Sequence, residues 1–259
     1  MYAFVSILNH RARTRTYSLS AETINIDSLD QINPLDGELV KPILYTHVSG
    51  LSNLPVTQAK KKFIAAVLPA ILIARHQIET TRIRIFALTD KSIWNKADSS
   101  FYFEVKSRYR AKDIGDLIDR IGTLPNSVVL SQAAVESGWG QSRFFLEGNN
   151  LFGVWSFKSD EQRMPSKRGR NSKTIYLRTY ADIGQSVVHY FEILGSVNAY
   201  QKLRKERLVR TDPFELIPHL RNYSERRTSY TNQLKAVILQ NELTRYDRYR
   251  LDPQYLTED

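Results

Sequence analysis

The stretch SQAAVESGWGQSRFFLEGNNLFGVWSF, residues 131–157, decides the fold. Its first part continues an apolar segment with helical spacing, which opens at Pro125 and ends at Gly138 and Gly140. The carboxylate of Glu136 lies at the end of this predicted helix, directly before the glycines. A helix end holds a carboxyl group in one position, and glycine lets a ligand approach the backbone closely. The pattern therefore marks Glu136 as a candidate catalytic residue.

The residue types around Glu136 indicate which chemistry it would serve. Apolar walls from Val135, Trp139 and Phe152 would raise the pKa of the carboxyl, because burial disfavours its charged form. A carboxylic acid that stays protonated near neutral pH can protonate a departing oxygen, as the acid of a glycosidase does. The aromatic residues suited to stacking on sugar faces are Trp139, Phe152, Trp155 and Tyr180. The alternative is a surface glutamate beside a glycine turn, with these aromatic residues in the core.

The rest of the chain predicts a mainly helical fold with one β-hairpin. The apolar run Phe63–Ala74 is shorter than the roughly twenty residues of a membrane-spanning helix, so we expect a core helix, kinked at Pro69. Residues 82–112 are expected to hold strand-like pieces, and 156–180 a β-hairpin with an exposed basic tip. Further helices are predicted over 113–121, 125–137, 183–194, 198–209, 212–221 and 226–244.

Changes in composition along the chain predict that it is divided into three parts. Residues 1–55 are rich in Ser, Thr and Asn, with Pro and Gly as punctuation, and we expect a poorly defined, peripheral N-terminal extension. Residues 56–246 form the predicted catalytic domain, and 247–259 a loose C-terminal tail. The opening MYAFVSILNHRAR has no basic region followed by an apolar core and a cleavage site, so no standard signal peptide is predicted.

Composition also excludes several kinds of site. The chain has no cysteine, which rules out disulfides, thiolate metal sites and a cysteine nucleophile. The five histidines are scattered without metal-ligand spacing, and His189 is assigned a structural role in a helix. Phosphate-binding and dinucleotide-binding loops are absent from the sequence. We therefore expect no metal and no organic cofactor.

The motifs VESGWGQSRF (135–144) and NNLFGVW (149–155) resemble the signature of the glucosaminidase family, glycoside hydrolase family 73. This family includes flagellar peptidoglycan hydrolases and bacterial autolysins. Within it, the sequence is most similar to the Bax family of bacterial proteins. Three more segments resemble the family in the right order, so the resemblance covers about 57–240: KKFIAAVLPAILIA (61–74), SVNAYQKLR (196–204) and LRNYSERRTSYTNQLKAVI (220–238).

The resemblance implies a fold, a reaction and a set of site residues. The fold is lysozyme-like, mainly α (α+β), with a helical lobe, a small β-hairpin lobe and a glycan cleft between them. The reaction is hydrolysis of the β-1,4 bond after N-acetylglucosamine in peptidoglycan. Glu136 falls on the family's catalytic acid, and Tyr200 on a cleft tyrosine that is important for activity. The expected substrate-binding residues are Ser137, Trp139, Asn149, Asn150, Phe152, Trp155 and Tyr180.

A second catalytic carboxylate is harder to assign. Many relatives carry a glutamate in the hairpin, where this chain has Tyr176. Asp160 and Glu161, at the start of the hairpin, are the best candidates, while Asp182 has the pattern of a helix cap. Retaining, inverting and substrate-assisted mechanisms all stay open. We hypothesise that Glu136 is the only indispensable carboxylate, with the substrate's 2-acetamido group as nucleophile and Tyr200 positioning it.

The net charge of the chain and its expected substrate class indicate which binding partners to expect. The net charge of +10 favours attraction to the acidic cell wall, and no nucleic-acid-binding module accompanies it, so we expect peptidoglycan strands and no nucleic acid as partners. This substrate places the protein in the cell envelope. The alternatives are a lytic transglycosylase or muramidase on the same fold, and a non-catalytic wall-binding module.

Overall fold

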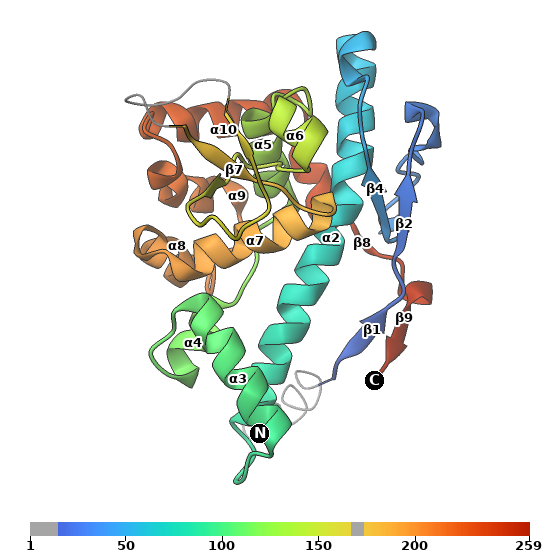
Figure 1. Ribbon diagram of the computed structural model, residues 1–259. Helices are drawn as coiled ribbons and strands as arrows, with labels where there is room; N and C mark the ends of the chain where they lie inside the picture. Colours follow the sequence, from blue (N-terminus) through green and yellow to red (C-terminus); the bar gives the residue numbers. More distant parts are fainter. Residues whose placement is uncertain (1–14, 167–173) are drawn as a thin grey trace.

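The chain is organised around one long helix, α2 (Val56–Leu88), in the computed structural model, which describes residues 15–166 and 174–259 (Figure 1). Every residue of the run 63–74 is buried, so other elements enclose this part of α2 on all sides. Helix α2 is long and apolar enough to span a membrane by those criteria, but 72% of its most apolar window lies inside the protein. It is therefore the predicted core helix.

Shorter helices surround α2 and confirm the mainly α prediction. Among the helices, α7 and α5 pack most extensively onto α2. The predicted helices over 113–121, 125–137 and 183–194 are all present, with boundaries within a few residues. The remaining helices are α3 (Lys96–Tyr109), α4 (Ile114–Arg120), α5 (Asn126–Ser137), α6 (Arg143–Gly148), α7 (Ile183–Ser196), α8 (Gln201–Glu206), α9 (Pro213–Leu216) and α10 (Thr228–Gln240). The 3-10 helices include η3 (Asn198–Tyr200), η4 (Ile217–Tyr223) and η5 (Leu243–Arg248).

The strand-like pieces expected over 82–112 were wrong. Residues 82–88 complete α2, and α3 begins at a capping box in which Asn95 and Asp98 each accept the other's backbone N–H. The alternation of Arg82–Ile85 resembles a strand, yet Ile78, Ile85 and Leu88 are buried at a spacing that fits one helix face. The packing of this helix face against the core therefore outweighs the strand-like alternation of residues 82–85, and the segment is helical.

The two ends of the chain pair with each other beside α2 (Figure 1). Strand β1 (Tyr17–Leu19) pairs antiparallel with β9 (Leu256–Glu258), and β3 (Leu39–Val40) pairs in parallel with β8 (Arg250–Leu251). Strand β2 (Glu22–Asn25) pairs with β4 (Ile43–Thr46), which packs on α2 and α7. The loose tail expected over 247–259 was therefore wrong.

The described part of the N-terminal extension also differs from the peripheral segment that we expected. Ile32, Ile43 and Tyr45 are almost completely buried in the same core as α2. The Tyr45 hydroxyl accepts a hydrogen bond from the Asn33 backbone, which ties two parts of the segment together. The boundaries of the catalytic domain at 56 and 246 stay a prediction.

The predicted β-hairpin is present and carries one extra strand. Strand β7 (Tyr176–Arg178) lies between β5 (Trp155–Ser156) and β6 (Arg163–Pro165), and both pairings are antiparallel. The basic tip that we expected falls on 167–173, outside the described residues. This small sheet packs beside α6, which follows the stretch that contains Glu136.

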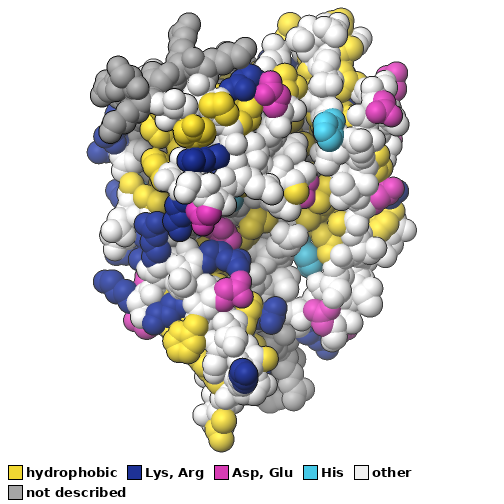
Figure 2. Space-filling model, in the orientation of Figure 1, with side chains coloured by type: hydrophobic (Ala, Val, Ile, Leu, Met, Phe, Trp, Pro, Cys, Tyr) yellow, Lys and Arg dark blue, Asp and Glu magenta, His cyan; other side chains and the backbone are white. Residues whose placement is uncertain are grey.

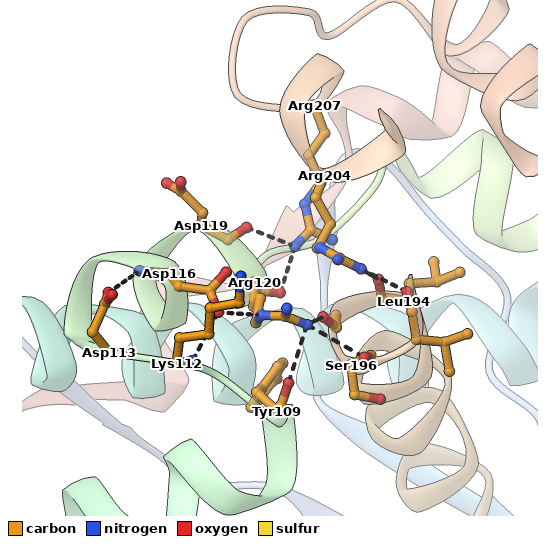
Figure 3. Close-up of polar contacts among 12 residues, drawn as sticks. Tyr109, Lys112, Asp113, Asp116, Asp119, Arg120, Leu194, Ser196, Arg204 and Arg207 are labelled. Carbon is orange, nitrogen blue, oxygen red and sulfur yellow. Dashed lines mark hydrogen bonds and ion pairs between the residues drawn. The ribbon is translucent and has the colours of Figure 1, made fainter. Parts of the chain in front are cut away.

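Buried arginines hold the C-terminal end of α7 (Figure 3). Arg120 Nη1 donates to the carbonyls of Gly195 and Ser196, at 3.2 and 3.3 Å. Arg204 Nη1 donates to Leu194 O and Val197 O, at 3.0 and 2.8 Å. Cations near the last turn of a helix satisfy its free carbonyls and favour its dipole. The contacts fix where the chain leaves α7, directly before η3.

Candidate active site

A groove of about 1130 Å³ lies between the hairpin lobe, α7 and the segments around η3 and η4. The residues at its Glu136 end are Glu136, Phe152, Trp155, Tyr180, Tyr200 and Tyr223. On the face shown in Figure 2, Lys and Arg side chains gather over the left half, over α4, α7 and α8 of Figure 1. Its lining brings together Glu136, Tyr200 and three of the predicted sugar-stacking residues, Phe152, Trp155 and Tyr180.

Glu136 sits in the last turn of α5, and Gly138 ends that helix in the left-handed conformation, at φ 60°. The Glu136 side chain accepts a hydrogen bond from the Tyr230 hydroxyl. That hydroxyl in turn accepts a hydrogen bond from Gln132 Nε2, one turn earlier on α5, at 2.9 Å. Burial raises the pKa of Glu136, and this outweighs the lowering by Tyr230 and by the more distant Arg226. The carboxyl is thus held in one position and biased toward its protonated form.

Aromatic rings around Glu136 cause this burial. Phe152 stacks on Tyr190, with centroids 4.2 Å apart at 15°, and Tyr190 donates a hydrogen bond to Gln132 Oε1 at 2.5 Å. Tyr223 stacks on Tyr230, with centroids 5.8 Å apart at 7°. Sequence reasoning gave no role to these tyrosines. For Tyr223 and Tyr230 the only signal was the segment 220–238, which resembles the family but gave its tyrosines no role; Tyr190 was predicted only as part of a helix.

Tyr200, the last residue of η3, is buried and lines the groove near Glu136. Its ring centroid is 6.4 Å from that of Tyr223. Burial, followed by the negative charge of Glu136, raises the pKa of Tyr200 to about 12. The hydroxyl therefore stays protonated at neutral pH and can donate a hydrogen bond into the groove.

Two predicted substrate-binding residues point away from the groove. Ser137 is fully buried, and its hydroxyl donates to Ala133 O at 2.6 Å and accepts from Gly140 N at 2.9 Å. Trp139 packs edge-on against Phe63, with centroids 5.6 Å apart at 68°. Successive residues of a helix point about 100° apart, so Glu136 and Ser137 cannot both face the groove. Neither residue lines the groove, and their predicted roles in substrate binding stay predictions.

The asparagines of the NN motif build the groove wall without lining it. Asn149 ends α6 at φ 51°, and its Nδ2 donates to Tyr180 O at 3.0 Å. Asn150 is buried; its Nδ2 donates to Val154 O and Arg178 O, and its Oδ1 accepts from Val154 N. These contacts join the loop after α6 to the hairpin lobe. In this structure both asparagines hold the backbone of the groove wall, and their contact with substrate stays a prediction.

The remaining predicted aromatic residues do line the groove. Trp155 is 42% exposed, and Phe152 also forms part of the groove wall. The Tyr180 hydroxyl lies 2.7 Å from His189 Nδ1. Burial lowers the pKa of His189 to about 4, so this imidazole is neutral at physiological pH. His189 was assigned a structural role from sequence, and it holds Tyr180 while lining the groove itself.

The second-carboxylate candidates do not line the groove. Glu161 accepts a hydrogen bond from Ser156 Oγ at 2.7 Å and forms an ion pair with Arg178. Burial acts to raise the pKa of Glu161, but these two partners, together with hydrogen bonds from the backbone of Lys158 and Phe157, outweigh it, so the pKa is lowered. Asp160 is exposed on the turn before it. Neither Asp160 nor Glu161 therefore contacts the groove in which a second catalytic carboxylate would act.

A carboxylate that sequence reasoning missed does line the groove. Glu192, on α7, lies 3.2 Å from Arg108 Nη1 on α3. Burial raises the pKa of Glu192 more than Arg108 lowers it. Nothing in the helical spacing of α7 distinguished this residue. Within 15–166 and 174–259, no group of three His, Asp or Glu residues is placed to hold a metal ion.

The chain is similar to several known proteins. The protein named bax of Escherichia coli K12 is 29% identical over 200 residues, which cover 72% of this chain and 71% of that protein. The catalytic domain of the autolysin Auto from Listeria monocytogenes superposes with a TM-score of 0.40 and 20% identity, over 63% of this chain and 94% of that one. A peptidoglycan hydrolase from Sphingomonas sp. A1 gives 0.40 and 21%, over 56% and 90%.

A family model matches the part of the chain that contains Glu136. Residues 111–243, just over half of the 259-residue chain, match the glucosaminidase family, described as mannosyl-glycoprotein endo-beta-N-acetylglucosaminidase. The matched segment runs from α4 to η5 and contains Glu136, the hairpin lobe and the tyrosines around them. The chain belongs to the glucosaminidase family.

Proposed function

We propose that this protein is a peptidoglycan hydrolase that acts as an endo-β-N-acetylglucosaminidase, cleaving the β-1,4 bond after N-acetylglucosamine. The observation that carries the proposal is the Glu136 carboxyl, whose pKa is raised by burial, at the floor of an aromatic-lined groove. A general acid needs a proton at the operating pH and a fixed position beside the leaving oxygen. Membership of the glucosaminidase family supports the same bond type.

In the proposed mechanism, Glu136 gives its proton to the departing glycosidic oxygen as the bond to the anomeric carbon breaks. The substrate's 2-acetamido oxygen attacks that carbon, and the protonated Tyr200 hydroxyl orients the acetamido group. Glu136, now a carboxylate, then takes a proton from the water that opens the cyclic intermediate. Tyr230 and Gln132 hold the carboxyl in position through both steps. The mechanism needs no carboxylate from the hairpin, which fits the absence of Asp160 and Glu161 from the lining of the groove.

Product analysis tests the bond and the mechanism together. Purified sacculi digested with the protein are reduced with borohydride and analysed by mass spectrometry, with Glu136→Gln in parallel. Reduced N-acetylglucosamine ends that are lost in the variant support the proposal. Reduced muramic ends would indicate a muramidase, and anhydro-muramic ends a lytic transglycosylase. Binding without products at any pH would indicate a wall-binding module.

The proposed substrate also implies a location and a partner. Peptidoglycan lies outside the cytoplasmic membrane, so we expect the protein to act in the cell envelope. The net charge of +10 favours its attraction to the acidic wall, and salt should weaken that attraction.

A further inference from the structure

The groove has two ends of different chemistry. Aromatic side chains, among them Trp155 and Phe157, lie at the hairpin end, where sugar faces can stack. The other end is polar, and the residues there that come from α2 and α3 are Gln77, Ser107, Arg108 and Arg110. These four residues precede residue 111, where the match to the family begins.

One of the two arginines at the polar end, Arg110, forms no ion pair with an acidic group of the described residues. The charged residues that line the groove are Arg108, Arg110, Lys158, Arg178, Glu136 and Glu192. Arg178 pairs with Glu161, and Arg108 pairs with Glu104 and Glu192. No acidic group among the described residues pairs with Arg110. The groove thus presents an uncompensated guanidinium at its α3 end.

The backbone conformation of Arg110 fixes the point from which its side chain extends. Arg110 ends α3 in the left-handed conformation, at φ 53°, and its N–H donates to Ser107 O at 3.1 Å. Its side chain is exposed, so its five donors face solvent or a bound ligand. A guanidinium matches a carboxylate with two parallel hydrogen bonds, whereas neutral sugars offer no such partner.

Resting on the proposed function, we propose that the α3 end of the groove binds a carboxylate of the acidic peptides that branch from peptidoglycan, and that Arg110 determines this specificity. The preferred substrate is then glycan that still carries its peptides. The sugars occupy the aromatic end beside Glu136, and a peptide branch extends along α7 toward α3. Arg108 stays engaged with Glu192 and shapes the wall beside this site.

Binding to an inactive variant tests this separately from catalysis. Glu136→Gln protein is sedimented with glycan strands that carry peptides, and with the same strands stripped of peptides by an amidase, both freed of other anionic polymers. We expect about tenfold tighter binding to the peptide-bearing strands, the size of one good charge-assisted contact. Arg110→Gln in the same background should abolish most of this preference. Raising the salt concentration should reduce it.

Two matched substitutions locate the effect. Lys158→Gln removes a cation at the hairpin end of the groove that forms no ion pair with the described residues, and Arg250→Gln removes an exposed cation on β8, outside the groove. Both should keep the preference. Equal binding to the two kinds of strand, or a preference that survives Arg110→Gln, would overturn the proposal; so would a preference lost only in Lys158→Gln. A wild-type protein that yields no products would overturn the proposed hydrolase activity, yet leave this binding result standing.

Discussion

The hydrogen bond from Tyr230 to Glu136 gives a prediction whose sign follows from the structure. Tyr230→Phe removes the hydroxyl that lowers the pKa of Glu136, and it leaves the buried ring in place. A hydrogen bond to a charged group contributes about 1.5–3 kcal/mol, and one pKa unit corresponds to about 1.4 kcal/mol. The pKa of Glu136 should therefore rise by about one to two units in the variant.

The pH dependence of kcat/KM on sacculi reports this change. If Glu136 acts as the general acid, activity falls as its proton is lost, and the alkaline limb of the profile marks the pKa of Glu136 in the free enzyme. Tyr230→Phe should move this limb to higher pH by about one to two units. Tyr223→Phe is the matched control, because its hydroxyl donates to Phe152 O instead of to Glu136. An alkaline limb that stays in place or moves to lower pH in Tyr230→Phe would refute the reasoning.

The same substitution has a separate effect on stability. Gln132 is fully buried, and its Nε2 loses the Tyr230 oxygen as an acceptor. An unsatisfied buried donor costs about 1–3 kcal/mol, so the free energy of unfolding should fall by that amount. Denaturant unfolding measures this loss, and the pH profile is then read below the unfolding transition.

Further predictions concern the carboxylates and one close contact. Because the pKa of Glu136 is raised in the fold, its contribution to stability is present at acid pH and lost as pH rises through that pKa. Glu136→Gln should therefore melt higher than wild type at pH 7 and similarly below pH 4; a lower melting point at pH 7 would contradict this. Glu161→Gln should keep sacculus hydrolysis within a few fold, whereas Glu136→Gln should lose about 10²–10⁴ in kcat; comparable losses in the two would restore Glu161 as a catalytic group. Gly195→Ala places a Cβ 2.6 Å from the Tyr109 ring and 2.7 Å from Arg120 O, and should lower the unfolding free energy by about 1–3 kcal/mol; unchanged thermal unfolding would refute this.

The hydrogen bonds that Arg120 and Arg204 donate to the C-terminal end of α7 also position a residue of the groove. The carbonyls that accept from Arg120 and Arg204 lie within Leu194–Val197, directly before the turn that carries Tyr200 (Figure 3). Both guanidiniums are nearly buried, so these contacts are not weakened by solvent as surface pairs are. The position of Tyr200 in the groove thus depends on side chains from α4 and α8.

The sequence by itself determined the features that depend on near neighbours in the chain. Pro125 and Gly138 bound α5, and the position of Glu136 in its last turn follows from those two ends. The mainly α class, the hairpin and the family all follow from local motifs and their order. Helix caps and periodicity act within a few residues, so they can be recognised without knowledge of the fold.

Only the tertiary structure decided which side chains meet at the site. Tyr230 reaches Glu136 from α10, and Arg108 meets Glu192 from α3, across separations that no local pattern encodes. Ser137 and Trp139 belong to the same motif as Glu136, yet the helix turn and the packing of Phe63 direct them away from the groove. Strands β1 and β9 are too short to show a pattern, and each becomes a strand only by pairing with the other end of the chain. Short-range forces set the elements, and long-range packing of their faces selects the residues that form the groove.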